Sequence, residues 1–317
     1  MKILITDCAT LTHENDLPLD TFNKFGTVSL FDMLTGDDLL REIRDADILL
    51  CNKTVIDRTV LDASKQLKYI GLFATGYNNI DTQYAKQKGV TVCNAGTYST
   101  SAVAQQTFAY ILSHYSAVER YSSLVKKGEW IASPTFSMLC CPTDELCGKT
   151  IGIIGFGSVG KRVAEIALAF EMKVLVYTRT PKVYPNIEFV DLETLLGQSD
   201  IVSVHCPLNE QSAKMFNEHT FSLMKDSAFF INTARGGVVD ENALLEALKS
   251  GKLSGAAIDV LTVEPMSEDC VLLNAPNIII TPHTSWAPVT TRKRLLRIVE
   301  ENINSFLNGK PQNVVNL

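Results

Sequence analysis

The chain has 317 residues, 46% of them hydrophobic and 20% charged, and its 29 basic and 35 acidic residues give a formal net charge of −6. This is the composition of an ordinary globular protein, and the length favours two domains over one hydrophobic core. The acidic balance argues against nucleic acid or an anionic membrane as the main partner, because a phosphate-binding face needs an excess of Lys and Arg. No apolar run approaches the length of a transmembrane helix.

Short β-type runs alternate with helical patterns along the chain, which predicts parallel sheets covered by helices on both faces. The apolar part of residues 1–7 is too short for a signal peptide and predicts a first strand. Thr35 to Asp38 resembles a capping box, and Asp57 can cap a helix that runs through Leu61. In this first third, strands are predicted over residues 2–6, 28–31, 48–51, 69–73 and 91–93.

Two long helical patterns enclose a second series of strands. The first covers residues 101–126, and the second covers residues 289–307 and ends at the stop signal Asn308-Gly309-Lys310-Pro311. Because the second pattern cannot extend the strands before it, we expect this helix to cross back to the first domain. The strands of the second series are predicted over residues 151–154, 174–177, 201–205, 228–232, 256–258 and 278–280.

The eight cysteines are scattered without a C-x-x-C spacing, and several lie in apolar contexts where cysteine behaves as a small core residue. A disulfide framework is not expected in a chain of this size, so we predict reduced thiols and a cytoplasmic protein. Cys140, Cys141 and Cys147 have no nearby histidine and do not match the spacing of a zinc site. No metal is predicted.

The run Gly155-Phe156-Gly157-Ser158-Val159-Gly160 lies between a predicted buried strand and a helical pattern. Strand, glycine turn and helix together are typical of dinucleotide binding, whereas a bare G-x-G-x-x-G is weak. Gly155 permits the tight turn, Gly157 lets the backbone approach a pyrophosphate, and Gly160 lets helix and strand pack closely. We therefore predict a dinucleotide site here; the alternative is a tight turn that binds nothing.

Ionisable residues follow three predicted strands of the second half. Arg235 comes after residues 228–232, Asp259 and Glu264 come after residues 256–258, and His283 comes after residues 278–280. Ligands of open parallel sheets bind beyond the carboxyl ends of the strands, so these side chains can converge on the reactive end of the cofactor. Taken singly, each could be a surface arginine, a salt-bridged glutamate or a hydrogen-bonded histidine without a catalytic role.

The reduction of a 2-oxo acid would give each of these groups a role. Arginine binds a carboxylate through two parallel hydrogen bonds, which suits Arg235 to the substrate. Histidine titrates in the range needed to donate and reclaim a proton, which suits His283 to the carbonyl oxygen. A neighbouring Glu264 would favour the imidazolium and fix the tautomer of the ring.

With these motifs the chain resembles the D-isomer-specific 2-hydroxyacid dehydrogenases over nearly all of its length. Besides the glycine motif, the family signatures are residues 232–240, residues 259–265 and Pro282-His283. The resemblance implies two Rossmann-like, doubly wound α/β domains with parallel sheets and the active site in a cleft between them. The substrate domain is expected from residues 1–100 plus 285–317, and the nicotinamide dinucleotide-binding domain from residues 101–284. A homodimer is also implied.

The resemblance also implies a set of site residues. Arg235 would orient the substrate, His283 would be the acid/base and Glu264 its partner. Thr75 and Gly76, in the loop of residues 74–81, would hold the substrate carboxylate through their backbone N–H groups. The remaining positions implied to line the cofactor are Thr100, Cys206, Pro207, Thr233, Ala234 and Asp259, the last beside the nicotinamide carboxamide.

Within the family, the chain is most similar to the D-glycerate dehydrogenase or hydroxypyruvate reductase branch, in residues 74–81, 98–100, 205–208 and 282–287. Gln105 departs from the glutamate of many relatives. Two alternatives stay open. A 3-phosphoglycerate dehydrogenase would need further cations, for which Lys53 is the candidate in the first domain, although it could equally be a solvated surface lysine. A nucleotide-sensing corepressor would bind partner proteins and keep similar motifs.

The cofactor prediction can be narrowed at the end of the second strand of the nucleotide domain. Sites that prefer NAD place an acidic side chain there to bind the ribose hydroxyls. Here the strand is followed by Thr178-Arg179-Thr180, and no carboxylate comes before Glu188. Arg179 could accept a 2′-phosphate, so we expect NADP to be tolerated or preferred; alternatively, Arg179 points to solvent and NAD binds without the acid.

Between the first long helix and the glycine-motif strand lies an apolar run, residues 133–141. It contains Pro134, Phe136, Met138 and Leu139, for which a monomer has no evident use. We expect this run to reach the partner in a homodimer; the alternative is a loop packed on its own domain.

Overall fold

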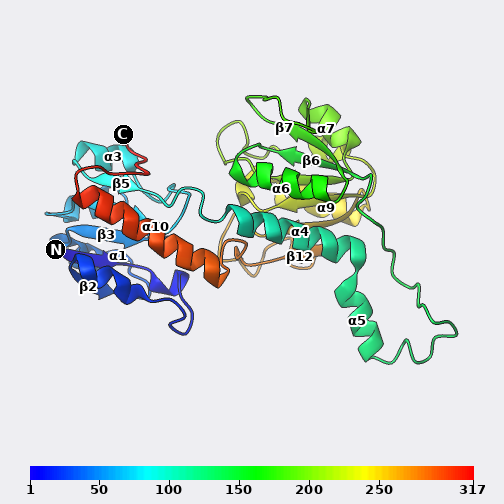
Figure 1. Cartoon of the computed structure of the whole chain (residues 1–317), viewed down its shortest axis with the longest axis horizontal. Coiled ribbons are helices and arrows are strands. Elements are labelled where there is room, and N and C mark those ends of the chain that lie inside the picture. The colour runs from blue at the N-terminus through cyan, green and yellow to red at the C-terminus, as the bar shows by residue number, and fades with distance from the viewer. The chain divides into compact units, whose positions relative to one another are not determined.

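The computed structural model describes all residues from 1 to 317, and the chain divides into two compact units. Unit 1 comprises Met1–Ser99 and Ala287–Leu317, and unit 2 comprises Thr100–Trp286 (Figure 1). Each unit is built on one parallel sheet with helices. The α/β prediction with two parallel-sheet domains is therefore confirmed.

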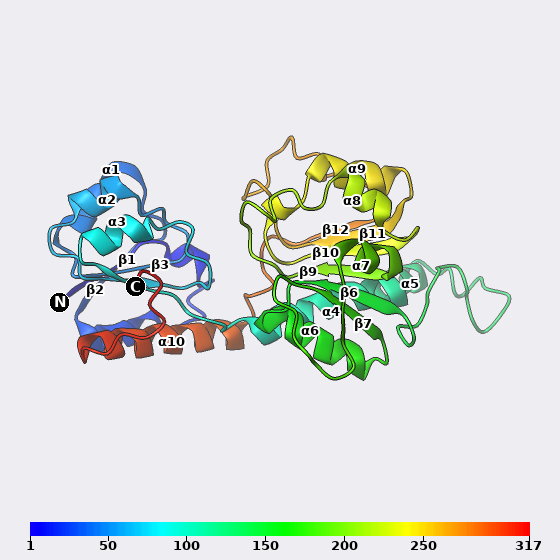
Figure 2. The ribbon, with the colours of Figure 1, turned by 90° about the horizontal axis from the view of Figure 1, so that it is seen from above.

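Unit 1 has a five-stranded parallel sheet in the order β2-β1-β3-β4-β5. Helices α1 to α3 cover one face of this sheet and α10 covers the other (Figure 2). Leu4, Leu49 and Ile70 of the strands pack against Leu39 and Leu61 of the helices in one buried core. The strands are β1 (Lys2–Ile5), β2 (Thr27–Leu30), β3 (Ile48–Cys51), β4 (Tyr69–Leu72) and β5 (Thr91–Cys93), and the helices are α1 (Gly36–Glu42), α2 (Arg58–Ala63), α3 (Thr82–Gln87) and α10 (Val289–Leu307).

Helix α10 belongs to unit 1, as its predicted return to the first domain requires. Its predicted bounds are confirmed. The ring of Phe306 contacts Tyr69 of β4 with 4.8 Å between centroids, and Asn302 Nδ2 donates a hydrogen bond of 2.8 Å to the Asn94 carbonyl. Near its start, Arg292 pairs with Asp16 at 2.5 Å, and this guanidinium holds the pKa of the Asp16 carboxyl well below its usual range.

Unit 2 has a seven-stranded parallel sheet in the order β12-β11-β10-β9-β6-β7-β8. Helices α4 and α6 pack on one face and α7, α8 and α9 on the other, each layer with its own buried core (Figure 2). The strands are β6 (Thr150–Ile154), β7 (Lys173–Tyr177), β8 (Glu188–Phe189), β9 (Ile201–Val204), β10 (Ala228–Asn232), β11 (Leu253–Ile258) and β12 (Ile278–Ile280). The helices are α4 (Thr100–Ser116), α5 (Val118–Lys126), α6 (Ser158–Ala169), α7 (Leu192–Gln198), α8 (Glu218–Leu223) and α9 (Glu241–Lys249).

Two local predictions need correction, and one short strand was not predicted. The helix predicted over residues 101–126 is two helices, because Ala117 has a left-handed backbone with φ 48° that ends α4 and turns the chain into α5. Strand β8 was not predicted, since two residues carry no alternation to recognise. Thr35 precedes α1 without a side-chain capping bond, whereas Asp57 does cap α2 by accepting from Val60 N at 3.0 Å.

Short 3₁₀ turns lie at Cys8–Thr10, Leu19–Phe25, Ile43–Asp45 and Gly236–Val238. None of the helices combines the length and the apolar character that crossing a bilayer would demand.

Candidate functional site

The glycine motif forms the turn between β6 and α6 in unit 2. Gly155 has φ 95°, a conformation that side chains rarely adopt, and a Cβ there would lie 2.9 Å from the backbone of His205 and Cys206. A Cβ on Gly160 would lie 2.1 Å from the Gly155 carbonyl oxygen, so helix and turn are in close contact. At Gly157 a Cβ would meet nothing within 4 Å. The turn therefore leaves open space at the N-terminus of α6, which fits a pyrophosphate.

Phe156, Ser158 and Val159 complete the motif. The Phe156 ring stands edge-on to Tyr184 and Phe189 at 5.5 and 5.2 Å between centroids, which ties the turn to the segment after β7. Ser158 and Val159 begin α6. Within the motif, the Phe156 side chain packs against the rest of unit 2, whereas Gly157 and Ser158 are exposed.

The end of β7 lies beside this turn, because Gly155 N donates a hydrogen bond of 2.8 Å to the Tyr177 carbonyl. Thr178, Arg179 and Thr180 follow directly, with Thr178 half-buried and the other two exposed. No acidic residue stands between Tyr177 and Glu188 in this part of the structure. A cation and two hydroxyls are therefore placed at the position that recognises the adenosine ribose in such folds.

On the other side of the motif, the residues after β9 and β10 are joined through His205. Its Nε2 is 2.9 Å from Ser203 Oγ, and its Nδ1 is 3.4 Å from Thr233 Oγ1. Although the residue keeps some exposed surface, desolvation of its ring lowers the pKa of His205 to about 3. A neutral His205 therefore holds Cys206-Pro207 and Thr233-Ala234 beside the glycine turn.

Arg235 follows β10 in a loop with defined internal hydrogen bonds. The Asn232 side chain donates from Nδ2 to the Arg235 carbonyl and accepts from Ala234 N, both at 3.0 Å. The next residue, Gly236, packs so closely that a Cβ there would lie 1.9 Å from the carbonyl carbon of Leu261. The Arg235 loop is thereby held against the loop that leads from Asp259 to Glu264.

His283 and Glu264 form a direct pair in unit 2. His283 Nδ1 is 2.7 Å from Glu264 Oε2, and the other oxygen, Oε1, accepts from Leu261 N at 2.9 Å. The side chains are 26% and 35% exposed, so solvent or a ligand can reach the imidazole. The expected hydrogen bond between Glu264 and His283 is present, and it leaves Nε2 as the nitrogen that can face a substrate.

Asp259 holds the segment that carries His283. Its buried carboxylate accepts from Thr281 Oγ1 at 2.5 Å, Thr284 N at 2.9 Å and Ser285 N at 2.9 Å. His283 itself has φ 55°, a left-handed conformation that is uncommon for residues other than glycine. The hydrogen bonds that Asp259 receives from Thr281, before His283, and from Thr284 and Ser285, after it, hold this backbone conformation in place.

Sequence reasoning did not find the support for this segment from α4. Tyr110, which is 3% exposed, hydrogen-bonds through its hydroxyl to Thr281 Oγ1. The signal that was present is a tyrosine within an otherwise apolar helical stretch, since a buried phenol needs a hydrogen-bond partner. Thr100, implied to line the cofactor, is the first residue of the same helix.

In unit 1, the loop of residues 74–81 follows β4. Thr75 Oγ1 donates to the Gly96 carbonyl at 2.5 Å, and Asn94 Nδ2 donates to the Thr75 carbonyl at 2.7 Å. Gly76 is half-buried and Lys53, in the loop after β3, is exposed. Asn79 Nδ2 donates to the Thr54 carbonyl at 2.8 Å, so the two loops that carry Lys53, Thr75 and Gly76 are joined.

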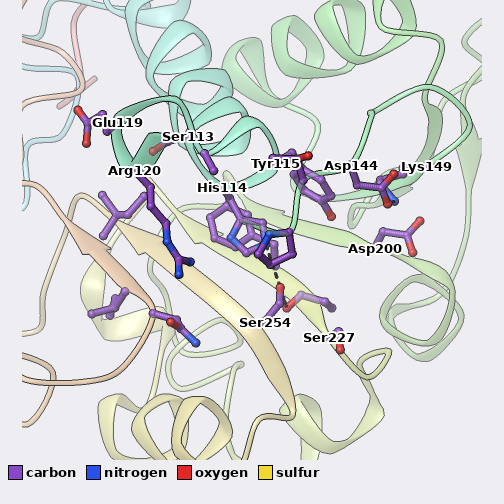
Figure 3. A pocket seen from close by; sticks show the side chains of 18 of the residues that line it. Ser113, His114, Tyr115, Glu119, Arg120, Asp144, Lys149, Asp200, Ser227 and Ser254 are labelled. Atoms are coloured by element: carbon purple, nitrogen blue, oxygen red, sulfur yellow. Dashed lines mark hydrogen bonds and ion pairs between the residues drawn. The ribbon is translucent and has the colours of Figure 1, made fainter. Parts of the chain in front are cut away.

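A separate hollow of about 950 Å³ lies on unit 2 (Figure 3). His114 and Arg120 point into it, and His114 Nε2 is 3.1 Å from Ser254 Oγ. Asp200 and Asn277, which precede β9 and β12, place it at the amino ends of the strands. It therefore lies at the opposite edge of the sheet from the glycine motif and His283. No group of three or more His, Cys, Asp or Glu that could hold a metal comes together in the structure.

Comparison with known proteins places these geometries in a family. Residues 108–285, more than half of the chain, match the model described as D-isomer specific 2-hydroxyacid dehydrogenase, NAD binding domain. The chain belongs to the D-isomer specific 2-hydroxyacid dehydrogenase family. It is 38% identical, over the full length of both chains, to a hydroxypyruvate reductase of Blautia hydrogenotrophica, and 38% identical over 89% of each to a glycerate dehydrogenase of Methylorubrum extorquens.

Among solved structures, an acyclic imino acid reductase in complex with NADPH and D-Arg is 31% identical, with a TM-score of 0.88 over 99% of this chain and 100% of the other. The resemblance to D-2-hydroxyacid dehydrogenases is thereby confirmed for the family, and so is the prediction that the protein is an enzyme. This dehydrogenase is an oxidoreductase that uses NAD(P) with small 2-oxo or 2-hydroxy acids, of the glycerate dehydrogenase and hydroxypyruvate reductase type.

Proposed function

We propose that this dehydrogenase reduces hydroxypyruvate to D-glycerate with NAD(P)H, and glyoxylate as a smaller second substrate. The observation that carries the proposal is the accessible pair of His283 and Glu264, 2.7 Å apart, with His283 in a left-handed backbone conformation beside the residues that Asp259 holds. Support comes from two relatives, each 38% identical, that bear the names hydroxypyruvate reductase and glycerate dehydrogenase.

In the proposed mechanism, each group acts at a defined atom of the substrate. Arg235 binds the carboxylate through its two-pronged guanidinium, and the backbone N–H groups of Thr75 and Gly76 bind it as well. When bound, a reduced nicotinamide supplies the hydride to the carbonyl carbon. His283 donates the Nε2 proton to the carbonyl oxygen as the C–O bond order falls. The product therefore forms as the neutral hydroxyl and not as a free alkoxide. Glu264 accepts from Nδ1–H and stabilises the imidazolium before transfer.

The residues proposed to hold the nicotinamide dinucleotide are those around the open turn of unit 2. The N–H groups at the start of α6 would bind the pyrophosphate, and Thr178 to Thr180 would bind the adenosine ribose. The nicotinamide half of the cofactor would be lined by Cys206, Pro207, Thr233, Ala234 and Thr100. Asp259 is already engaged by three internal donors. We therefore propose that Asp259 mainly holds the segment of His283 in place, and that it also contacts the nicotinamide carboxamide.

The function is tested by one assay matrix. Purified protein is mixed with NADH or NADPH and with hydroxypyruvate, glyoxylate, pyruvate or phosphohydroxypyruvate, and oxidation of the nicotinamide is followed. We expect the highest kcat/KM with hydroxypyruvate. A preference for phosphohydroxypyruvate would instead assign a 3-phosphoglycerate dehydrogenase, with Lys53 as a candidate phosphate ligand. Nicotinamide binding without turnover of any 2-oxo acid would favour a corepressor-like binding protein.

For the cofactor, we propose that NADP is tolerated or preferred. The exposed Arg179, between Thr178 and Thr180 and without a competing acid, supports the proposal, and one structural relative was solved with NADPH. Arg179→Ala is expected to weaken NADPH binding about tenfold and leave NADH binding unchanged, because one charge-assisted contact to the 2′-phosphate is lost. Fluorescence titration measures both affinities, with Lys182→Ala as the control for a nearby exposed cation. A kcat/KM more than tenfold higher with NADH than with NADPH would contradict this proposal.

We further propose a homodimer in which the segment of residues 133–141 reaches the partner. Phe136 and Leu139 are 90% and 91% exposed, and Ile131 just before them is 91% exposed. The segment follows α5 and extends away from the rest of unit 2 (Figure 1). Exposed apolar side chains on such an arm indicate a surface that another protein covers, and a second identical chain is the usual occupant.

The dimer is tested by light scattering at micromolar concentration, where we expect twice the chain mass of 34.9 kDa. The double variant Phe136→Asp with Leu139→Asp is expected to yield monomers, because two charges would be buried in the interface. Val183→Asp is the matched control, since Val183 is a fully exposed apolar residue outside the arm. A monomeric mass for the unmodified protein would contradict the proposal.

We also propose that the protein has no nucleic-acid partner and lies in the cytoplasm. The net charge of −6 supports the absence of a nucleic-acid partner, because binding to phosphates needs an excess of basic residues. The free state of all eight cysteines supports a cytoplasmic location.

A further inference from the structure

A buried carboxylate lies at the carboxyl edge of the sheet in unit 1. Asp7 follows β1, is 0% exposed, and receives hydrogen bonds from the loop after β3. Its Oδ2 accepts from Lys53 N at 2.6 Å and Thr54 N at 2.8 Å, and Asn52 N lies 2.9 Å from both carboxylate oxygens. Thr54 Oγ1 adds a further bond of 3.0 Å. Three consecutive backbone N–H groups therefore enclose this one anion.

Asp7 lies at the point of the sheet in unit 1 where ligands commonly bind in folds of this type. The strand order of unit 1 reverses between β1 and β3, and in such sheets the crevice at the reversal is where ligands bind. Here the amide groups at that place are already saturated by the protein's own carboxylate. Because these N–H groups already bind Asp7, they are not available to an external anion. The groups of unit 1 proposed above to bind a ligand are instead the N–H groups of Thr75 and Gly76 and the side chain of Lys53.

The same network extends to that neighbouring loop. Asn79 Nδ2 donates to the Thr54 carbonyl at 2.8 Å, and Ile56 N donates to the Asn79 carbonyl at 2.8 Å. The conformation that Asp7 imposes on Asn52 to Thr54 is thereby transmitted to residues 74–81.

We propose that Asp7 is a positioning residue for substrate binding: it sets the loop of Lys53 directly and the loop of Thr75 and Gly76 through Asn79. This inference rests on the proposed function, since it concerns how the 2-oxo acid is held. Asp7 does not touch the substrate itself. It belongs to unit 1, whereas the glycine motif, Arg235 and His283 all belong to unit 2.

The test is Asp7→Asn, which keeps the size of the side chain but replaces one acceptor oxygen with a donor that faces backbone N–H groups. The KM for hydroxypyruvate is expected to rise about tenfold, while kcat changes less than twofold and the Kd for NADPH stays unchanged. The matched control is Asp47→Asn. Asp47 Oδ2 accepts from Lys2 N at 2.8 Å at the opposite, amino edge of the same sheet, so its loss should leave KM unchanged.

A second variant covers the case in which Asp7→Asn does not fold. Asn79→Ala removes the side-chain bonds from Asn79 Nδ2 to the Thr54 and Asn52 carbonyls, at a half-buried position, and keeps the backbone bond from Ile56 N. It should raise KM with the same unchanged kcat and cofactor affinity. An unchanged KM in the folded variants would overturn the inference, and so would an equal fall of kcat and cofactor affinity, which marks general disruption. An assay of the unmodified protein distinguishes a failure of the proposed function from a failure of the role of Asp7. If the unmodified protein turns over no 2-oxo acid, the proposed function fails and this inference fails with it.

Discussion

We expect His283→Ala to lower kcat about a thousandfold while the Kd for NADPH stays unchanged. The factor lies within the range that general acid–base catalysis contributes, roughly 100-fold to 10,000-fold. Without the imidazole, the developing alkoxide must take its proton from water. Cofactor binding is spared because the cofactor residues proposed around Gly157, Thr178 and Cys206 keep their own hydrogen bonds. Steady-state kinetics and a fluorescence titration of NADPH give the two quantities.

His219→Ala is the control for this prediction, because His219 is exposed on α8 of the same unit. It should leave both quantities unchanged. A loss of NADPH binding in His283→Ala would show that His283 has a structural role instead.

Glu264→Gln is a second readout of the same pair. The amide keeps the size of the side chain but replaces the carboxylate that faces His283 Nδ1 at 2.7 Å and accepts from Leu261 N at 2.9 Å. We expect kcat for hydroxypyruvate to fall while the Kd for NADPH stays unchanged, because a carboxylate no longer orients the imidazole. An unchanged kcat would separate Glu264 from the proton transfer.

The second large effect is expected at Arg235. Arg235→Gln should lower kcat/KM for hydroxypyruvate about 100-fold, which corresponds to roughly 3 kcal/mol, the upper range for a hydrogen bond to a charged group. Arg235→Lys keeps the charge but loses the two parallel donors, so its kcat/KM should lie between those of the unmodified protein and the glutamine variant.

Arg41→Gln in α1 is the control, since Arg41 forms an exposed pair with Asp38 and should be neutral. Thermal unfolding of all three variants should lie close to that of the unmodified protein, because the Arg235 loop is held mainly by Asn232 and by the close packing of Gly236. The guanidinium adds one bond to this loop, from Nη1 to the Ala234 carbonyl at 2.7 Å. Lysine and glutamine variants with full kcat/KM would remove Arg235 from substrate binding.

Much of the fold was predictable because its signals are local. A buried parallel strand is a short apolar run, and β3, β5, β10 and β12 were predicted with the bounds that the structure has. The glycine motif was recognisable for the same reason, since strand, turn and helix are consecutive in the chain. Parallel sheets then require that Arg235, Asp259 and His283, each after a strand, lie at one edge of the sheet.

The break at Ala117 and the two-residue strand β8 were not predictable in this way. Residues 101–126 keep a helical pattern across the break, and the left-handed turn falls on an alanine, a residue that does not mark a turn in the sequence. Strand β8 exists because Val190 N and its neighbours find partners on β7, a contact between segments that local propensity does not encode.

The sequence by itself determined which residues we propose for the chemistry and at which edge of the sheet they lie, because strand patterns and the glycine motif consist of residues that are neighbours in the chain. Only the tertiary structure decided what holds them there. The bonds from Asp259 to residues 281–285 and from Asp7 to residues 52–54 join positions more than 20 residues apart in the chain. Such pairs leave no periodic trace, and a buried carboxylate finds its donors only once the strands between them have been placed.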